Sequence, residues 1–212
     1  MMKYFIKTPG WLQKLFSSFT WKITTEEKAL YLTFDDGPHP VATPFVLDEL
    51  KKVNATATFF CIGKNVVAYP EIYRRILDEG HAVGNHTQNH LNGWKENDKT
   101  YLLDIAEASK YIDSNLFRPP YGKITPFQAK NISSAMHTSD IQIVMWDVLS
   151  ADFDPSFSAM DCVKHVMKNA GNGSIVVFHD SEKAFSRLAD ALPVILNELG
   201  KTGFVFKKIK GK

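Results

Sequence analysis

The sequence predicts an α/β fold in which about seven parallel strands form a closed or nearly closed (β/α) barrel. Three observations support this prediction. The chain has 212 residues, a length that suits one sizeable domain. From Ala29 onward, short runs rich in β-branched and aromatic residues alternate with longer segments of helical period, as in repeated βα units. Reactive side chains directly follow several strand candidates, as expected where barrel strands open on one face.

The expected elements follow in chain order. The strand candidates are short β-branched or aromatic runs at residues 29–34, 56–61, 81–84, 115–118, 141–146, 174–178 and 203–206. Between them, segments of helical period predict helices at residues 44–53, 70–79, 99–113, 157–170 and 183–200. Several of these end at a glycine, which is a common helix stop signal. A weaker pattern at residues 124–135 predicts a short helix followed by a loop.

Composition excludes some classes of protein. The 25 basic and 23 acidic residues give a net charge of +2, which is too balanced to predict a nucleic acid partner. Cys61 and Cys162 stand in no motif, so neither a disulfide framework nor a sulfur metal site is expected. The chain has no apolar run of about 18 residues or more, the length that predicts a spanning helix. We expect a monomer.

The first 23 residues are rich in aromatic side chains. Pro9 and Gly10 interrupt the hydrophobic run that a secretory signal needs, so the expected location is the cytoplasm or the periphery of a membrane. One face of a short helix would present Trp11, Leu12, Leu15, Phe16 and Phe19. The favoured interpretation is a helix packed on the domain. The alternative is contact with a membrane surface through residues 1–23.

The first motif is Thr33-Phe34-Asp35-Asp36-Gly37-Pro38. Asp, Gly and Pro are ordinary turn residues, so simple turn chemistry is one interpretation. Two adjacent carboxylates after an apolar strand are less ordinary, because like charges repel unless a cation or a hydrogen-bond network compensates them. The turn is therefore a candidate site.

The second motif, His86-Thr87-Gln88-Asn89-His90, predicts a metal site. Residues at i and i+4 project from the same side of a helical turn, so both imidazoles would reach one ion. A carboxylate from the first motif would complete three ligands and leave positions open, as in catalytic sites. Zinc is the first choice for this ligand set, and cobalt and nickel are alternatives. The alternative interpretation is a pair of surface or core histidines in a polar loop that bind no metal.

Three later segments complete the candidate site. Arg118-Pro119-Pro120-Tyr121-Gly122 could form a rigid loop that aims a backbone N–H at an oxyanion, or could simply end a strand. The segment from Trp146 to Phe153 offers an aromatic wall and the Asp152 carboxylate. His179 ends an apolar strand, where a lone histidine is usually structural, but beside a metal site it becomes a candidate proton donor.

These motifs resemble those of the polysaccharide deacetylase family, also called the NodB-homology or carbohydrate esterase family 4 group. Thr-Phe-Asp-Asp-Gly-Pro, His-Thr-x-x-His and Arg-Pro-Pro-Tyr-Gly match almost letter for letter and in order. The resemblance begins at about Lys28 and runs nearly to the C-terminus. It divides the chain into an N-terminal extension, residues 1–27, and a NodB-like domain, residues 28–212.

The resemblance implies a distorted (β/α) barrel of about seven parallel strands, and a role for each matching residue. Asp35 would be the general base and Arg118 its partner, and the metal ligands would be Asp36, His86 and His90. Tyr121 would offer its backbone N–H to the oxyanion, and His179 would be the general acid. Trp146 and Val177 would line the pocket for the acetyl methyl group.

The last two motifs depart from the family pattern. Leu149 and Phe153 stand where an acid and a tryptophan are usual, which leaves Asp152 as the only acid of that motif. Val177 replaces the usual leucine before His179. Because of these departures, the sequence predicts neither the shape of the pocket nor whether Asp152 pairs with Arg118 or with His179.

We therefore expect a metal-dependent hydrolase that removes N-acetyl groups from N-acetylglucosamine-type residues of a glycan such as peptidoglycan or chitin. An O-acetyl esterase of the xylan type would use the same residues. A catalytically silent carbohydrate-binding protein is a second alternative, although binding alone needs neither Asp35 nor His179. A membrane-associated structural protein that uses residues 1–23 is a third.

Overall fold

Strand β1 (Ala29–Asp35) is an interior strand of a parallel sheet, and every one of its residues is buried. The structure is a computed structural model that describes residues 4–211. The other strands are β2 (Thr58–Cys61), β3 (Ala82–Asn85), β4 (Leu116–Phe117), β5 (Gln142–Ile143), β6 (Val148–Leu149), β7 (Ile175–His179) and β8 (Val205–Phe206). Their order is β5-β4-β3-β2-β1-β7-β6, and β8 pairs with the start of β1.

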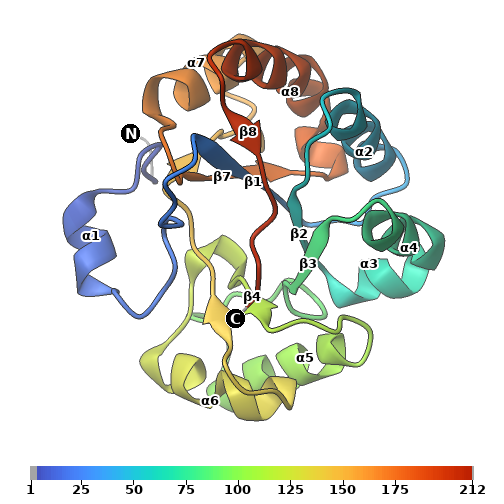
Figure 1. Cartoon of the computed structure of the whole chain (residues 1–212). Helices are drawn as coiled ribbons and strands as arrows, with labels where there is room; N and C mark the ends of the chain where they lie inside the picture. The colour runs from blue at the N-terminus through green and yellow to red at the C-terminus, as the bar shows by residue number, and fades with distance from the viewer. Residues whose placement is uncertain (1–3, 212) are drawn as a thin grey trace.

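The sheet curls into an incomplete barrel (Figure 1). Its two outermost strands, β5 and β6, are consecutive in the chain. In a flat sheet of this order they would lie about 29 Å apart at a strand spacing of about 4.8 Å. The five peptide steps from Ile143 to Val148 span at most about 18 Å, so the sheet must bend. The predicted parallel, distorted (β/α) barrel is therefore confirmed.

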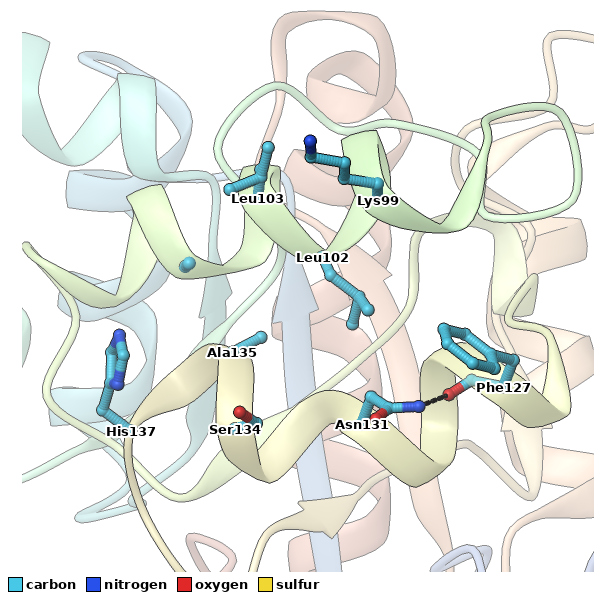
Figure 2. A pocket seen from close by; sticks show the side chains of 9 residues that line it. Lys99, Leu102, Leu103, Phe127, Asn131, Ser134, Ala135 and His137 are labelled. Atoms are coloured by element: carbon cyan, nitrogen blue, oxygen red, sulfur yellow. Dashed lines mark hydrogen bonds between the residues drawn. The ribbon is translucent and has the colours of Figure 1, made fainter.

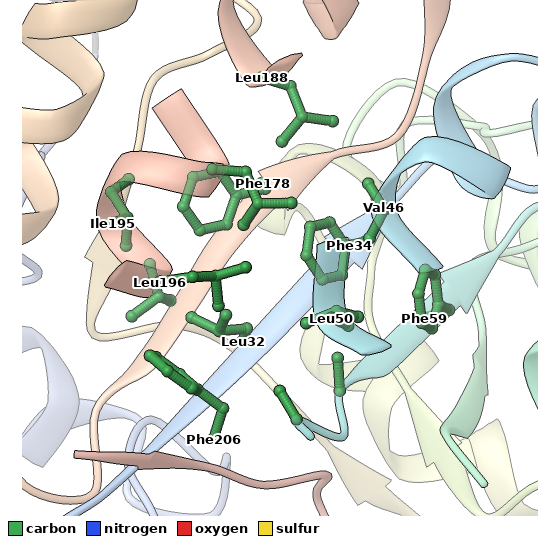
Figure 3. Packing of buried hydrophobic residues seen from close by; sticks show 14 of the residues in the cluster. Leu32, Phe34, Val46, Leu50, Phe59, Phe178, Leu188, Ile195, Leu196 and Phe206 are labelled. Atoms are coloured by element: carbon green, nitrogen blue, oxygen red, sulfur yellow. The ribbon is translucent and has the colours of Figure 1, made fainter. Parts of the chain in front are cut away.

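Side chains of β1 alternate between the helical layer and the barrel interior. Phe34 stacks between Phe59 of β2 and Phe178 of β7, at centroid distances of 5.1 and 5.8 Å. Helices α2 (Ala42–Lys52) and α8 (Glu182–Lys201) cover this cluster (Figure 3). Thr33 and Asp35 lie on the opposite face of the strand, because neighbouring side chains alternate. A polar pair thus points into the barrel from a strand whose outer face is apolar.

The predicted helices are present with small shifts at their ends. They are α2 and α8, with α4 (Pro70–Asp78), α5 (Asp98–Ser109) and α7 (Ala159–Asn169). The short helix α3 (Gly63–Ala68) and the 3-10 turn at Pro120–Gly122 were not predicted. The expectation of a short helix with a loop at 124–135 is wrong, because α6 (Pro126–Met136) is continuous. A reciprocal capping box between Thr125 and Gln128 starts it.

The single strand predicted at residues 141–146 is also wrong. Strand β5 ends at Ile143, and β6 is a separate strand on the far edge of the sheet. Between them, Thr20 donates its N–H to the Ile143 carbonyl, and Met145 donates to the Thr20 carbonyl, both at 2.8 Å. Residues 144–147 therefore pair with the N-terminal segment, which no local pattern could have revealed.

Residues 4–23 run along the gap between β5 and β6. Lys7 bridges to Val148, Thr20 to Val144 and Lys22 to Ser174, and α1 (Gly10–Leu15) lies between these contacts. The predicted shared face of a helix is wrong, because Trp11 is 63% and Leu15 67% exposed, whereas Leu12 and Phe19 pack on a core cluster that includes Trp21 and Phe117. Residues 1–3 of the predicted extension lie outside the described residues.

The helical layer also forms a groove on the surface. Helices α5 and α6 pack against each other and leave a groove of about 430 Å³ that Leu102, Phe127 and Ala135 help to line (Figure 2). Among the described residues, 4–211, no helix combines the length and apolar character needed to cross a membrane.

Candidate active site

The Asp35-Asp36-Gly37 turn is held tightly at the end of β1. Asp36 adopts a left-handed backbone with φ 81°, and its carbonyl accepts a hydrogen bond from the Asn65 amide at 2.7 Å. The Gly37 N–H donates to Asp180 Oδ1 at 3.1 Å. A side chain at position 37 would meet Asp180 Oδ2 at 2.1 Å, so only glycine fits this close approach.

Three potential metal ligands meet beside this turn. Donor atoms of Asp36, His86 and His90 all lie within 4.8 Å of one another. Asp36 Oδ1 is 3.2 Å from His90 Nε2 and 3.7 Å from His86 Nε2, yet it is buried and has no hydrogen-bond partner. A buried carboxylate oxygen without a partner is costly. A cation at this point would satisfy it, so the residues present fit a divalent metal.

A loop, and not the helical turn expected from the sequence, brings the two histidines together. The helical turn expected at residues 86–90 is absent. The segment is a loop in which Thr87 and His90 have left-handed backbones, with φ 65° and 59°. Such conformations are strained for these residue types and cluster at functional sites. The loop places the centroids of the two imidazole rings 5.1 Å apart.

The protonation of these groups suits a cation. His86 Nδ1 lies 2.7 Å from the Arg118 carbonyl, so Nδ1–H donates there and Nε2 is free to bind a metal. Burial lowers the pKa of His86 to about 4, so this ring is neutral at pH 7. Burial would raise the pKa of Asp36, but the adjacent His90 ring and the cationic His179 ring outweigh it and hold that pKa below its ordinary value.

Asp35 pairs with Arg118 inside the barrel. Arg118 Nη1 donates to Asp35 Oδ1 and to Thr33 Oγ1, both at 2.7 Å. The guanidinium is completely buried, and its other nitrogens donate to the carbonyls of Val144 and Met145. Burial lowers the pKa of Arg118, whereas the Asp35 carboxylate raises it. A buried guanidinium in which each nitrogen donates a hydrogen bond has little freedom to move, so Arg118 fixes the orientation of Asp35.

Asp152 pairs with His179, not with Arg118. Asp152 Oδ1 lies 2.8 Å from His179 Nδ1, and Oδ2 accepts the His179 backbone N–H at 2.8 Å. Burial would lower the pKa of His179, but the charge and hydrogen bond of Asp152 raise it to about 9. The imidazole is therefore cationic at neutral pH and can donate a proton.

A cleft of about 950 Å³ joins these groups. Asp35, Asp36, His86, His90 and His179 line it, and so do the predicted pocket residues Tyr121, Trp146 and Val177. Tyr121 has a left-handed backbone with φ 59°, and its ring lies 4.7 Å from that of His90. At Gly122, φ is +64° and an added Cβ would lie 2.8 Å from the Trp146 ring. Glycine therefore lets the loop reach the cleft.

Two aspartates hold the site without having been predicted. Asp104 of α5 accepts the backbone N–H groups of Gln88 and Asn89 at 3.0 Å and the Asn89 side-chain amide at 2.6 Å. Asp180 accepts from Gly37 and from the Thr43 hydroxyl. Both anchor a loop that bears a potential ligand. In the sequence, Asp104 is not distinguished from other acidic residues of a predicted helix. Asp180 directly follows His179, and this position is a signal that could have indicated a role at the site.

Comparison with known proteins finds a matching family and similar chains. A family profile described as polysaccharide deacetylase matches residues 22–138. The chain is 39% identical over 193 residues to a peptidoglycan-N-acetylglucosamine deacetylase of Bacillus cereus, covering 88% of this chain and 89% of that protein.

Two solved structures are similar as well. The Bc1960 peptidoglycan N-acetylglucosamine deacetylase superposes with a TM-score of 0.81 at 30% identity, over 97% of this chain and all of that one. The peptidoglycan deacetylase PdaC from Bacillus subtilis gives a TM-score of 0.77 at 32% identity, over 88% and 90% of the two chains.

Proposed function

The chain belongs to the polysaccharide deacetylase family, and on that premise we propose that it removes N-acetyl groups from N-acetylglucosamine-type residues of a glycan. One observation supports this most strongly: an arginine-held carboxylate, a potential three-ligand cation site and a cationic histidine line the same cleft. The similar proteins described above are named as peptidoglycan deacetylases, so we favour peptidoglycan over chitin as the polymer.

Asp36, His86 and His90 would hold a divalent cation. We propose zinc, because two imidazoles and one carboxylate are ligands that zinc commonly takes; cobalt and nickel remain alternatives. When bound, the ion would supply Lewis acidity, which activates water and stabilises negative charge on a carbonyl oxygen.

The protein groups would move the protons of the hydrolysis. Asp35, held by Arg118, would accept a proton from the attacking water as its oxygen bonds to the amide carbon. The Tyr121 backbone N–H would stabilise the resulting oxyanion. His179 would protonate the nitrogen as the C–N bond breaks, because an amine cannot leave as its anion. The products are acetate and a free amino sugar, and Trp146 and Val177 would surround the acetyl methyl group.

The test is acetate release from peptidoglycan and from N-acetylglucosamine oligomers. Each substrate is assayed after chelation and again after addition of zinc, cobalt or nickel. We expect chelation to abolish acetate release and one of these metals to restore it. Release from O-acetylated xylan but not from any N-acetylated sugar would assign the site to an esterase. A chelator-resistant activity would contradict the metal proposal.

A further inference from the structure

The catalytic residues occupy only part of the cleft. Residues of the N-terminal segment form its other wall, and they are Tyr4, Phe5, Thr8, Leu12, Phe16, Phe19 and Trp21. The volume of about 950 Å³ lies near the top of the range of about 300–1,000 Å³ that encloses drug-sized ligands. One N-acetylated sugar at the catalytic end would leave much of this space unfilled.

The wall presents aromatic faces that are accessible from the cleft. Phe16 and Phe19 stack with an interplanar angle of 9° and a centroid distance of 5.9 Å. Phe16 is 41% and Phe5 54% exposed. Aromatic rings in a partly polar cleft offer flat apolar surfaces, and the C–H faces of a pyranose ring are flat and apolar too.

The wall is also fixed in place. Leu149 donates its N–H to the Ile6 carbonyl at 2.9 Å, and Thr8 donates to the Asp147 carbonyl at 2.9 Å. Lys7 Nζ reaches the buried Asp147 carboxylate at 2.6 Å. At the other end, Trp21 Nε1 donates to the Phe16 carbonyl at 2.9 Å. A surface held at both ends loses little entropy when it binds a ligand.

We propose that residues 5–19 form a glycan subsite in which Phe16 and Phe5 stack on sugar rings next to the one being deacetylated. This inference rests on the proposed deacetylase function. The segment would select extended glycans over short ones, because only a longer chain reaches both the catalytic residues and the aromatic wall.

The test compares a dimer and a pentamer of N-acetylglucosamine as substrates. We expect Phe16→Ala to lower kcat/KM for the pentamer about three- to tenfold, mainly through KM, as loss of one aromatic contact implies. The dimer should change less than about twofold. Phe5→Ala should act in the same direction. Trp11→Ala is the control, because Trp11 is more exposed but does not line the cleft.

The possible outcomes are distinguishable. Phe16→Ala keeps the carbonyl that binds Trp21, and its melting temperature should match that of Trp11→Ala. Equal losses on dimer and pentamer, or no loss on either, would overturn the subsite while leaving the deacetylase function intact. Wild-type protein that releases no acetate from either oligomer or from peptidoglycan would overturn both proposals.

Discussion

Two carboxylates joined by one peptide bond are in different environments at this site. Asp35 faces the barrel interior and binds Arg118, whereas Asp36 turns toward His86 and His90. Adjacent like charges are tolerated because each has its own compensating group. We propose that this separation lets one carboxylate move protons while the other holds an ion.

Asp35→Asn should separate these two roles. The amide cannot accept a proton, so acetate release should fall about a hundredfold or more, but zinc content should stay near that of the wild type. His90→Ala should instead lower the zinc content itself, because a proposed ligand is lost. Elemental analysis after dialysis measures the ion. Equal loss of zinc in both variants would contradict the assignment.

The His179–Asp152 pair should make stability depend on pH. The folded pKa of His179 is raised to about 9, above the unfolded value of about 6.5. The pair therefore stabilises the fold fully below about pH 6.5, and this contribution is lost as pH rises through about 9. Asp152→Asn should lower the free energy of unfolding most near pH 6, by roughly 2–3 kcal/mol, and less near pH 10.

This pH dependence can be measured by chemical denaturation of the chelated protein across the range from about pH 6 to 10. Asp190→Asn is the control, because Asp190 is an exposed aspartate of α8. A stability difference between wild type and Asp152→Asn that stays constant across this range would contradict the raised pKa of His179.

At the scale of elements, helix α5 supports the histidine loop. Asp104 accepts two backbone N–H groups and one side-chain amide of residues 88–89, and left-handed residues flank this stretch. A strained loop persists only when its surroundings hold it. We therefore propose that the conformation of the histidine loop depends on a carboxylate that is not itself a proposed ligand.

Asp104→Ala should weaken zinc retention about tenfold or more without removing a ligand, because lost outer support of a metal site typically costs 10–100-fold in affinity. Glu107→Ala on the same helix is the matched control, because its side chain is partly exposed and contacts Lys110 and Tyr111 rather than the histidine loop. Competition with a chromophoric chelator gives the affinity. Identical zinc affinity in the two variants would contradict support by Asp104.

At the scale of the whole molecule, the barrel is completed by a segment from the far end of the chain. Residues 4–23 bond to the strands on both sides of the gap, and Trp21 joins a core cluster with Tyr101 and Phe117. The predicted boundary at residue 27 stays a prediction. These contacts nevertheless make residues 4–23 part of the wall of the barrel.

Removal of residues 1–23 should therefore destabilise the rest of the chain. The deletion exposes the buried face against Trp21 and strips the hydrogen-bond partners from Ile143, Met145 and Leu149. We expect the melting temperature to fall by about 5 °C or more, since about 1 kcal/mol shifts a domain of this size by roughly 2–4 °C. Thermal denaturation followed by circular dichroism measures the change. An unchanged melting temperature would show that the segment adds no stability.

The parallel α/β architecture could be predicted because strand and helix periods are local properties of the sequence. The order of motifs along the chain is also sufficient to indicate the family. The prediction of a helical turn at residues 86–90 was wrong for a local reason. The i and i+4 spacing of two histidines does not reveal that Thr87 and His90 have left-handed backbones. The roles assigned to the site residues stay predictions.

The sequence by itself determined where most of the strands end and which polar residues follow them, because alternation and turn chemistry act between near neighbours in the chain. Only the tertiary structure decided that Asp152 serves His179, that Asp104 and Asp180 hold the loops, and that residues 4–23 line the cleft. These partners lie 15 or more positions apart in the chain. They meet only when the sheet curls, and no short-range pattern records which distant side chain will be there.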